Sequence, residues 1–224
     1  MTDLTPIWLS LQLAFVTTLL LFVVAMPIAY QLAYKKFWLK PVVETLVSMP
    51  LVLPPTVLGF YLLLAFSPEA GIGRFLLDTL GLRLVFSFEG LVFASIIYSL
   101  PFMVHPLQNG FQAIPHNQIE AAGILGKNKW QTLWYVQLPQ MKASLLTGMI
   151  LSFAHTIGEF GVVLMIGGNI PGVTKVASIA IYDAVESMRY ASANLYSLIL
   201  LGFTFAILLL VYVVNGGYMK KFWK

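Results

Sequence analysis

Long apolar runs with few charges are the feature that most constrains what this chain can fold into. Five runs stand out, and each is long enough to cross about 30 Å of hydrocarbon as a helix, which takes about 20 residues. They are Ile7–Tyr34, Val42–Phe66, Phe88–Gln108, Ala143–Gly167 and Leu195–Val214. We therefore predict an all-α integral membrane protein with five transmembrane helices, or six if residues 173–193 hold a further one.

The composition favours a membrane protein and excludes several other classes. Hydrophobic residues make up 59% of the 224 residues and charged residues 10%, whereas a soluble domain has about 45–50% and about 25%. On so apolar a chain the net charge of +4 indicates basic cytoplasmic loops rather than nucleic-acid binding. Because there is no cysteine, disulfide frameworks, thiol catalysis and cysteine metal sites are excluded.

The distribution of Lys and Arg predicts the orientation, since these residues gather in cytoplasmic loops. Placing the loop at residues 113–139 inside the cell puts most of the basic residues on the inner side. They are Lys35, Lys36, Lys40, Lys127, Lys129, Lys142, Lys220, Lys221 and Lys224. We expect the N-terminus outside, the C-terminus inside and a single membrane domain over residues 1–224. Because the chain ends ten residues after the last predicted span, we expect no C-terminal regulatory domain.

The cytoplasmic loop at residues 113–139 predicts two short helices joined at a glycine. Asn117 followed three residues later by Glu120 is typical of a capping box at a helix start. Gly126 is expected to end this helix in a left-handed conformation. Asn128 is then placed to cap a second helix, and Pro139 is expected to stop it.

The spacing of residues in this loop resembles a known signature. Glu120-Ala121-Ala122, then Gly126, Val136 and Leu138-Pro139, is similar to E-A-A-x3-G-x9-I-x-L-P, the EAA signature of ABC-importer permeases, with Val136 replacing Ile. In that family the loop seats in a cleft of a separate ATPase and passes nucleotide-driven motion to the membrane helices. The resemblance implies a type I ABC importer permease fold. It assigns ATPase coupling to Glu120, Ala121, Ala122, Gly126, Leu138 and Pro139.

Irregular and ionisable positions inside the predicted spans are candidates for a translocation pathway. Three prolines within residues 50–55 cannot sit in a regular helix interior without freeing backbone carbonyls. Pro54 and Pro55 therefore predict either a simple kink or a hinge in the pathway wall. Glu159 is a carboxylate inside the fourth span, where an ionisable residue is a functional candidate. Since a carboxylate repels anions, we expect a gate, an orienting contact with His155, or a structural hydrogen bond. The pathway or gate candidates are Pro54, Pro55, Thr56, Thr156, Gly158, Glu159 and Gly161.

Three stretches narrow the resemblance further. Pro-Leu-Val-Leu-Pro-Pro at residues 50–55, Gly-Glu-Phe-Gly at 158–161 and Gly-Asn-Ile-Pro-Gly at 168–172 resemble the molybdate-importer branch of these permeases. His155 departs from the arginine expected there. The third stretch makes Asn169, Pro171 and Gly172 candidate contacts for a binding protein, although a bare turn needs no function. Sulfate or tungstate permeases are the alternative, because these dianions are similar tetrahedra.

The resemblance implies a transport subunit and not an enzyme. Because the chain has no G-x4-G-K-[ST] phosphate loop, MgATP is expected on a partner ATPase, with no cofactor and no metal in this chain. The implied partners are two copies of a cytoplasmic ABC ATPase, a periplasmic oxyanion-binding protein and a second copy of this chain. The implied location is the bacterial cytoplasmic membrane, with no nucleic acid bound.

Two other classes fit the sequence less well. A gradient-driven secondary transporter needs paired intramembrane ionisable groups, and Glu159 stands alone among the carboxylates of the fourth span. An intramembrane metalloenzyme needs a histidine pattern such as H-E-x-x-H, and His105, His116 and His155 show none.

Overall fold

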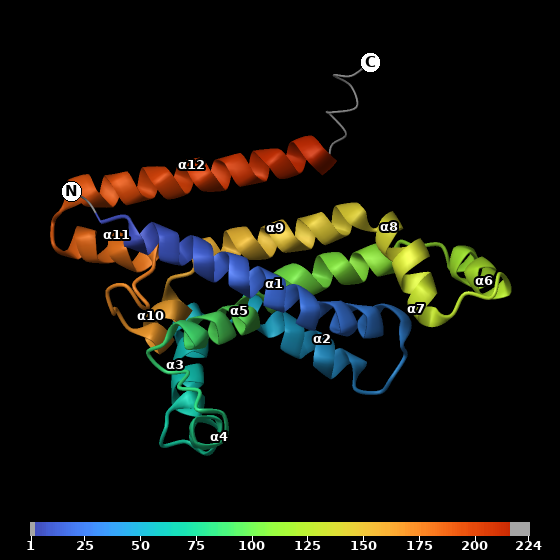
Figure 1. Cartoon of the computed structure of the whole chain (residues 1–224), viewed down its shortest axis with the longest axis horizontal. Helices are drawn as coiled ribbons and strands as arrows, with labels where there is room; N and C mark the ends of the chain where they lie inside the picture. Colours follow the sequence, from blue (N-terminus) through green and yellow to red (C-terminus); the bar gives the residue numbers. More distant parts are fainter. Residues whose placement is uncertain (1–2, 216–224) are drawn as a thin grey trace.

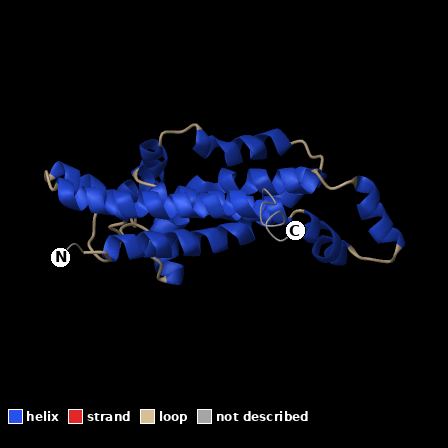
Figure 2. Ribbon diagram, turned by 90° about the horizontal axis from the view of Figure 1, so that it is seen from above, coloured by secondary structure: helices blue, strands red, loops and turns tan. Residues whose placement is uncertain are grey.

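Three long helices lie side by side along the longest axis of the molecule and form its bundle (Figure 1). They are α1 (Thr5–Tyr34), α5 (Phe88–Gln112) and α9 (Lys142–Gly158), and a fourth, α12 (Tyr190–Asn215), lies along the outside of α9. The computed structural model describes residues 3–215, and all regular elements in this range are helices (Figure 2). The predicted all-α membrane fold is confirmed.

Small side chains explain the close packing of α1 on α5. Ala14, Ala25 and Ala29 of α1 are fully buried, as are Ala94 and Ser95 of α5. Lipid tails are as apolar as the side chains, so helices in a membrane associate through close van der Waals packing, which small residues permit. The buried positions of α1 recur at intervals of three or four residues, so one stripe of the helix faces the bundle.

The second and fourth predicted spans are bent pairs and not straight helices. The second consists of α2 (Lys40–Ser48), a 3₁₀ turn (Met49–Leu51) and α3 (Pro55–Phe66), with a bend of 112°. The fourth consists of α9 and α10 (Gly161–Gly167), with a bend of 62°. The prolines thus produce a sharp turn where the sequence predicted a hinge or kink, because the ring removes a backbone donor and clashes with the preceding turn.

The number of spans agrees with the prediction of five if each bent pair crosses the membrane once. By length and composition, α1, α5 and α12 can each span a bilayer alone. Within residues 3–215 no sixth helix is long and apolar enough to span a membrane, so the alternative of six spans is not supported. The helix in the expected stretch, α11 (Ala177–Glu186), has 10 residues and is about 15 Å long.

Short helices occupy the two ends of the bundle. At one end lie α6 (His116–Ile124), α7 (Lys129–Thr132), a π-helical turn (Leu133–Gln137) and α8 (Leu138–Gln140). The N-terminus and α11 lie at the opposite end (Figure 1), and α4 (Gly71–Leu80) follows α3. This separation is what the predicted orientation requires. The orientation itself stays a prediction, and Lys220, Lys221 and Lys224 lie outside the described residues.

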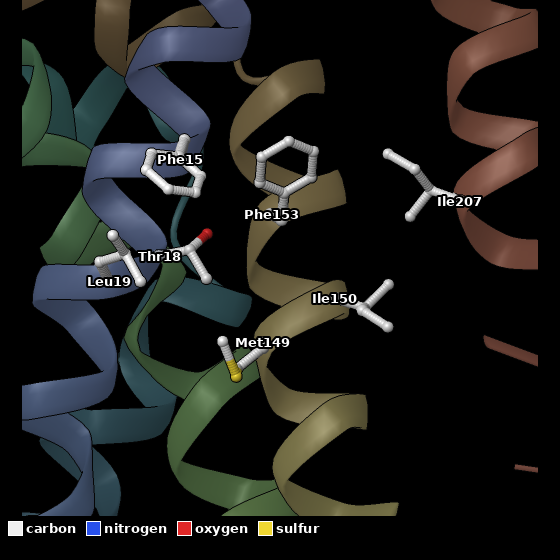
Figure 3. A pocket seen from close by; sticks show the side chains of 7 residues that line it. All are labelled: Phe15, Thr18, Leu19, Met149, Ile150, Phe153 and Ile207. Carbon is white, nitrogen blue, oxygen red and sulfur yellow. The ribbon is translucent and has the colours of Figure 1, made fainter. Parts of the chain in front are cut away.

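Helix α12 packs loosely on the rest of the bundle. Only 11% of its most apolar stretch is buried, so most of its surface is available to lipid. Between α12 and the bundle lies an open apolar cleft of about 290 Å³, in which Ile207 faces side chains of α1 and α9 (Figure 3). Its lining residues are Phe15, Thr18, Leu19, Met149, Ile150, Phe153 and Ile207.

Candidate functional site

The loop at residues 113–139 forms the predicted helix–glycine–helix. Gly126 has φ +76° and ends α6 in a Schellman motif. In that motif the Lys127 N–H donates to the Ala122 carbonyl and the Gly126 N–H to the Gly123 carbonyl, both at 3.0 Å. Asn128 caps α7 through a capping box with Gln131. The turn between α6 and α7 is therefore defined by local backbone chemistry.

Two local predictions in this loop are wrong. No side chain caps α6, because Pro115 occupies the N-cap position and the helix begins at His116. A capping box from Asn117 would require the helix to begin at Gln118, two residues later. The Glu120 carboxylate instead lies 3.5 Å from His116 Nε2. Pro139 does not stop the second helix, since the π-helical turn ahead of it widens the backbone and the helix continues to Gln140.

The face of the loop presents most of the predicted coupling residues to solvent. Glu120, Ala121, Gly126 and Pro139 are exposed, whereas Leu138 is half-buried and Ala122 is buried. Large apolar side chains lie exposed around them. They are Ile124, Leu125, Trp130, Trp134 and Tyr135, and Ile124 and Leu125 are 87% and 79% exposed. A polar-rimmed apolar patch of this kind is typical of a protein contact surface.

The breaks in the two bent spans surround a single pocket. The pocket has a volume of about 490 Å³ and is lined by Pro55, Thr56, Tyr98, Ala154, His155, Gly158, Glu159, Phe160 and Gly161. Five of the predicted pathway residues therefore lie around it: Pro55, Thr56, Gly158, Glu159 and Gly161. Pro54 directly precedes the wall as the N-cap of α3. Thr156 does not line the pocket, because it is buried and hydrogen-bonded to Ser99 (3.0 Å).

Glycines bring α3 and α10 into direct contact at this pocket. A Cβ atom on Gly161 would lie 2.8 Å from the Pro55 Cβ, and one on Gly59 would lie 2.8 Å from the Met165 Cβ. Real Cβ atoms do not approach so closely, so these positions suit only glycine in this packing. The close approach holds the two broken spans against each other.

Glu159 is buried in the pocket wall and held by serine hydroxyls. Its Oε2 accepts a hydrogen bond from Ser95 Oγ (2.7 Å), and its backbone carbonyl accepts one from Ser178 Oγ (2.6 Å). Its Oε1 has no partner within the described residues. His155 is instead 3.0 Å from Ser99 Oγ and stacks on Phe102. The expected contact between Glu159 and His155 is therefore not formed, and a structural hydrogen bond takes its place.

Sequence reasoning missed Ser95 and Ser99, which hold the two ionisable side chains. Both lie on α5, four residues apart and therefore on one face of that helix. A pair of serines at this spacing within an apolar span was the available signal. It is a weak one, because such hydroxyls commonly bond to their own helix backbone.

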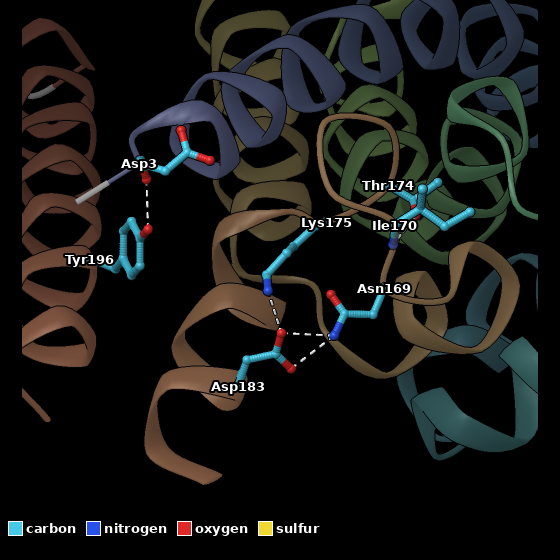
Figure 4. Close-up of polar contacts among 7 residues, drawn as sticks. All are labelled: Asp3, Asn169, Ile170, Thr174, Lys175, Asp183 and Tyr196. Carbon is cyan, nitrogen blue, oxygen red and sulfur yellow. Dashed lines mark hydrogen bonds and ion pairs between the residues drawn. The ribbon is translucent and has the colours of Figure 1, made fainter. Parts of the chain in front are cut away.

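The loop at residues 168–176 is held to α11 by a polar network around Asp183 (Figure 4). Asn169 Nδ2 donates to both carboxylate oxygens of Asp183 (2.9 and 2.7 Å), and Lys175 Nζ forms an ion pair with the same carboxylate. Partial burial acts to raise the pKa of Asp183, but hydrogen bonds from Lys175 and Asn169 outweigh it and lower the pKa below its ordinary value. Pro171 and Gly172 stay exposed, so of the predicted contact residues only Asn169 is engaged within the chain.

The Asp183→Asn substitution should loosen this loop. A neutral amide loses the ion pair with Lys175. We expect trypsin cleavage after Lys175 to accelerate about 1.4- to 5-fold, since ion pairs near the surface contribute about 0.2–1 kcal/mol and each 1.4 kcal/mol is about tenfold. In the wild type the stabilisation is present at neutral pH and is lost as the pH falls through the lowered pKa of Asp183. Mass spectrometry of the fragments measures the rate. Glu186→Gln, an exposed neighbour, is the control, and equal rates in both variants would contradict the role of the network.

The chain resembles known proteins in sequence over most of its length. Residues 22–219 match the family described as "Binding-protein-dependent transport system inner membrane component". The chain is 49% identical over 211 residues to the "Molybdenum transport system permease protein ModB" of Azotobacter vinelandii, covering 94% of this chain and 93% of that protein. It is 33% identical to the "Probable sulfate transport system permease protein cysT" of Chlorella vulgaris, covering 96% of this chain and 79% of that protein.

Two solved transporters share the fold. A chain of the inward-facing MetNI methionine ABC transporter superposes with a TM-score of 0.72 at 16% identity, covering 96% of this chain and 95% of that one. A chain of a bacterial alginate ABC transporter, solved with an alginate pentasaccharide-bound periplasmic protein, gives 0.75 at 17% identity, covering 94% of this chain and 77% of that one. The family match covers most of the chain, and this chain belongs to the inner membrane components of binding-protein-dependent transport systems.

Proposed function

We propose that this chain is the membrane-spanning permease subunit of an ATP-driven molybdate importer. The observation that carries the proposal is the 49% identity, over nearly the whole of both chains, to a protein named as a molybdenum transport permease. The relative named for sulfate transport is less similar, at 33% identity. The chain is a multi-pass inner-membrane protein and not an enzyme, so ATP hydrolysis takes place on a partner.

The assembly that we propose contains two copies of this chain, two cytoplasmic ATPase subunits and a periplasmic oxyanion-binding protein. The exposed apolar patch around Glu120 and Gly126 is the surface for the ATPase, and the loop at Asn169, Pro171 and Gly172 faces the binding protein. Five spans are too few to enclose a pathway, and closed two-fold symmetry is the commonest arrangement of an oligomer. The alginate transporter of the same fold was solved with a periplasmic protein, which supports such docking.

The pocket at the two bent spans is proposed as part of the pathway. No Lys or Arg lies within the predicted spans, so a desolvated dianion would meet neutral groups such as Thr56 and the backbone at Gly158. This favours weak, transient passage and places selectivity in the binding protein. Glu159 is proposed as a gate residue that the hydrogen bond from Ser95 keeps in position. Rigid-body movement of the two subunits would then expose the pocket alternately to either side.

Two substitutions of Glu159 distinguish the contribution of its charge from that of the position of its side chain. Glu159→Gln keeps an oxygen that can accept the hydrogen bond from Ser95, so we expect molybdate uptake within about threefold of the wild type. Glu159→Ala removes the acceptor and leaves a cavity, which costs about 2–5 kcal/mol for a large buried side chain, so uptake should fall at least tenfold. Uptake by proteoliposomes measures both. Equal loss in the two variants would show that the charge, and not the position of the side chain, is required.

Competition tests the substrate assignment. The chain is reconstituted with its neighbouring ATPase and binding protein, and uptake of labelled molybdate is measured with tungstate or sulfate in excess. We expect tungstate, a dianion of similar size and shape, to compete and a tenfold excess of sulfate to leave molybdate uptake nearly unchanged. Efficient sulfate uptake with little molybdate uptake would instead assign the chain to the sulfate branch.

A further inference from the structure

A chain of hydrogen bonds joins the loop at residues 113–139, the proposed coupling loop, to the ends of two bundle helices. Gln137 Nε2 donates to the Tyr34 hydroxyl (3.3 Å), and this hydroxyl donates to the backbone carbonyl of Phe111 (2.9 Å). Tyr34 is the last residue of α1, and Phe111 lies in the last turn of α5. Gln137 is 103 residues from Tyr34, which is 77 residues from Phe111. One hydroxyl therefore connects three distant segments.

Gln137 is a polar residue that is buried at the end of the π-helical turn. It is the last residue of the π-helical turn and stands directly before Leu138 and Pro139 of the coupling signature. Its side chain is only 2% exposed, and its Oε1 has no partner within the described residues. Burying a primary amide is costly unless it is hydrogen-bonded, and π-helical turns occur frequently at functional sites. The bond to Tyr34 satisfies one donor of the buried amide.

The Tyr34 ring is confined, so its hydroxyl has little freedom to follow Gln137. The ring packs edge-to-face against Tyr30 (centroids 5.1 Å apart) and against Phe111 (5.9 Å). Phe111 is itself fully buried. Because close-packed interiors transmit displacement instead of absorbing it, a shift of Gln137 must either move the ends of α1 and α5 or break the hydrogen bond to Tyr34.

We propose that Tyr34 is a positioning residue through which movement of the coupling loop reaches α1 and α5. When the coupling loop moves, Gln137 moves with it. The hydrogen bonds of the Tyr34 hydroxyl then transmit this movement to the backbone of α5 at Phe111. This role rests on the proposed function as an ATP-driven importer. It requires no contact of Tyr34 with the transported anion or with the ATPase, and it assigns to the π-helical turn the task of orienting Gln137 toward the bundle.

The test measures molybdate imported per ATP hydrolysed, in proteoliposomes holding this chain, its ATPase and its binding protein. Tyr34→Phe removes only the hydroxyl and keeps the ring packing. We expect the ratio of transport to hydrolysis to fall about fivefold, the effect of one lost hydrogen bond of typical strength, with stimulated ATP hydrolysis retained. Tyr30→Phe is the matched control, since the Tyr30 hydroxyl makes no hydrogen bond within residues 3–215, and its ratio should stay at the wild-type value.

A second variant distinguishes this coupling from a purely structural role. Gln137→Met has a similar volume and lacks the donor, and it should lower the ratio as Tyr34→Phe does. Because the two residues act in one chain of bonds, the double variant should be no worse than the stronger single one. A wild-type ratio in Tyr34→Phe, an equal loss in Tyr30→Phe, or additive losses in the double variant would overturn the proposal. Absence of ATP-dependent uptake by the wild type would instead overturn the proposed function, and this role with it.

Discussion

Replacement of Glu120 by lysine is expected to lower ATP-driven uptake by about two orders of magnitude and leave the membrane bundle folded. The Glu120 side chain is 65% exposed, and its carboxylate lies 3.5 Å from His116 Nε2 on the same helix, so the bundle loses no buried contact. Surface substitutions of this kind change stability by about 0.5 kcal/mol or less. At a docked interface, loss of a charged contact costs about 2–5 kcal/mol, and each 1.4 kcal/mol is about tenfold. Uptake should therefore fall about 100-fold.

Gln118→Lys is the control for this substitution. Gln118 is exposed on the same short helix but lies two residues away, and so on the opposite face. It should retain most of the uptake, and thermal unfolding should be alike in both variants. Gly126→Asp should behave as Glu120→Lys does, because Gly126 has φ +76°, where a residue with a Cβ atom is strained. Normal uptake by Glu120→Lys would contradict the assignment of this loop to the ATPase.

Gly90→Ala is expected to have the largest effect on folding. A Cβ atom at this position would lie 1.5 Å from the backbone carbonyl oxygen of Leu84, and backbone cannot move aside as a side chain can. Overpacking costs about 1–3 kcal/mol and sometimes more, so we expect about 3 kcal/mol or more, which lowers the melting temperature by about 10 °C. The affected segment also places α10, since the Phe86 N–H donates to the Ile166 carbonyl (2.9 Å).

Gly71→Ala supplies the matched control for folding. Gly71 is the first residue of α4, and a Cβ atom there would meet nothing within 4 Å. Thermal unfolding in detergent and the yield of folded protein should match the wild type for Gly71→Ala and fall for Gly90→Ala. Equal melting temperatures in the two variants would mean that the start of α5 does not pack against residue 84 as described.

The fold class could be predicted because it depends on local patterns. Apolar runs of membrane-spanning length appear in the sequence without knowledge of tertiary contacts. The geometry of the broken spans could not be predicted, since Pro54 and Pro55 indicate a break but not its angle. That angle depends on Gly161 and Gly59, which allow α10 to pack against α3. Such pairings join distant positions and leave no periodic signal in the sequence.

In the candidate sites, too, the local features could be predicted from the sequence and the contacts between distant residues could not. Gly126 and Asn128 were predicted correctly because a left-handed C-terminus and a capping box are local features. The polar partners of Glu159 and Tyr34 were not predicted. Ser95 lies 64 positions from Glu159 in the sequence, and Gln137 lies 103 positions from Tyr34. The capping box predicted at Asn117 was wrong because Pro115, which cannot cap with its side chain, already fills the N-cap position.

ATP-dependent accumulation of molybdate in sealed proteoliposomes tests the central claim most directly. Vesicles carry this chain with the binding protein outside, and the neighbouring ATPase is either included or omitted. We predict accumulation against a gradient only when both the ATPase and ATP are present, and its loss in Glu120→Lys. Accumulation that continues without the ATPase, driven by an ion gradient, would contradict the importer assignment and favour a secondary transporter.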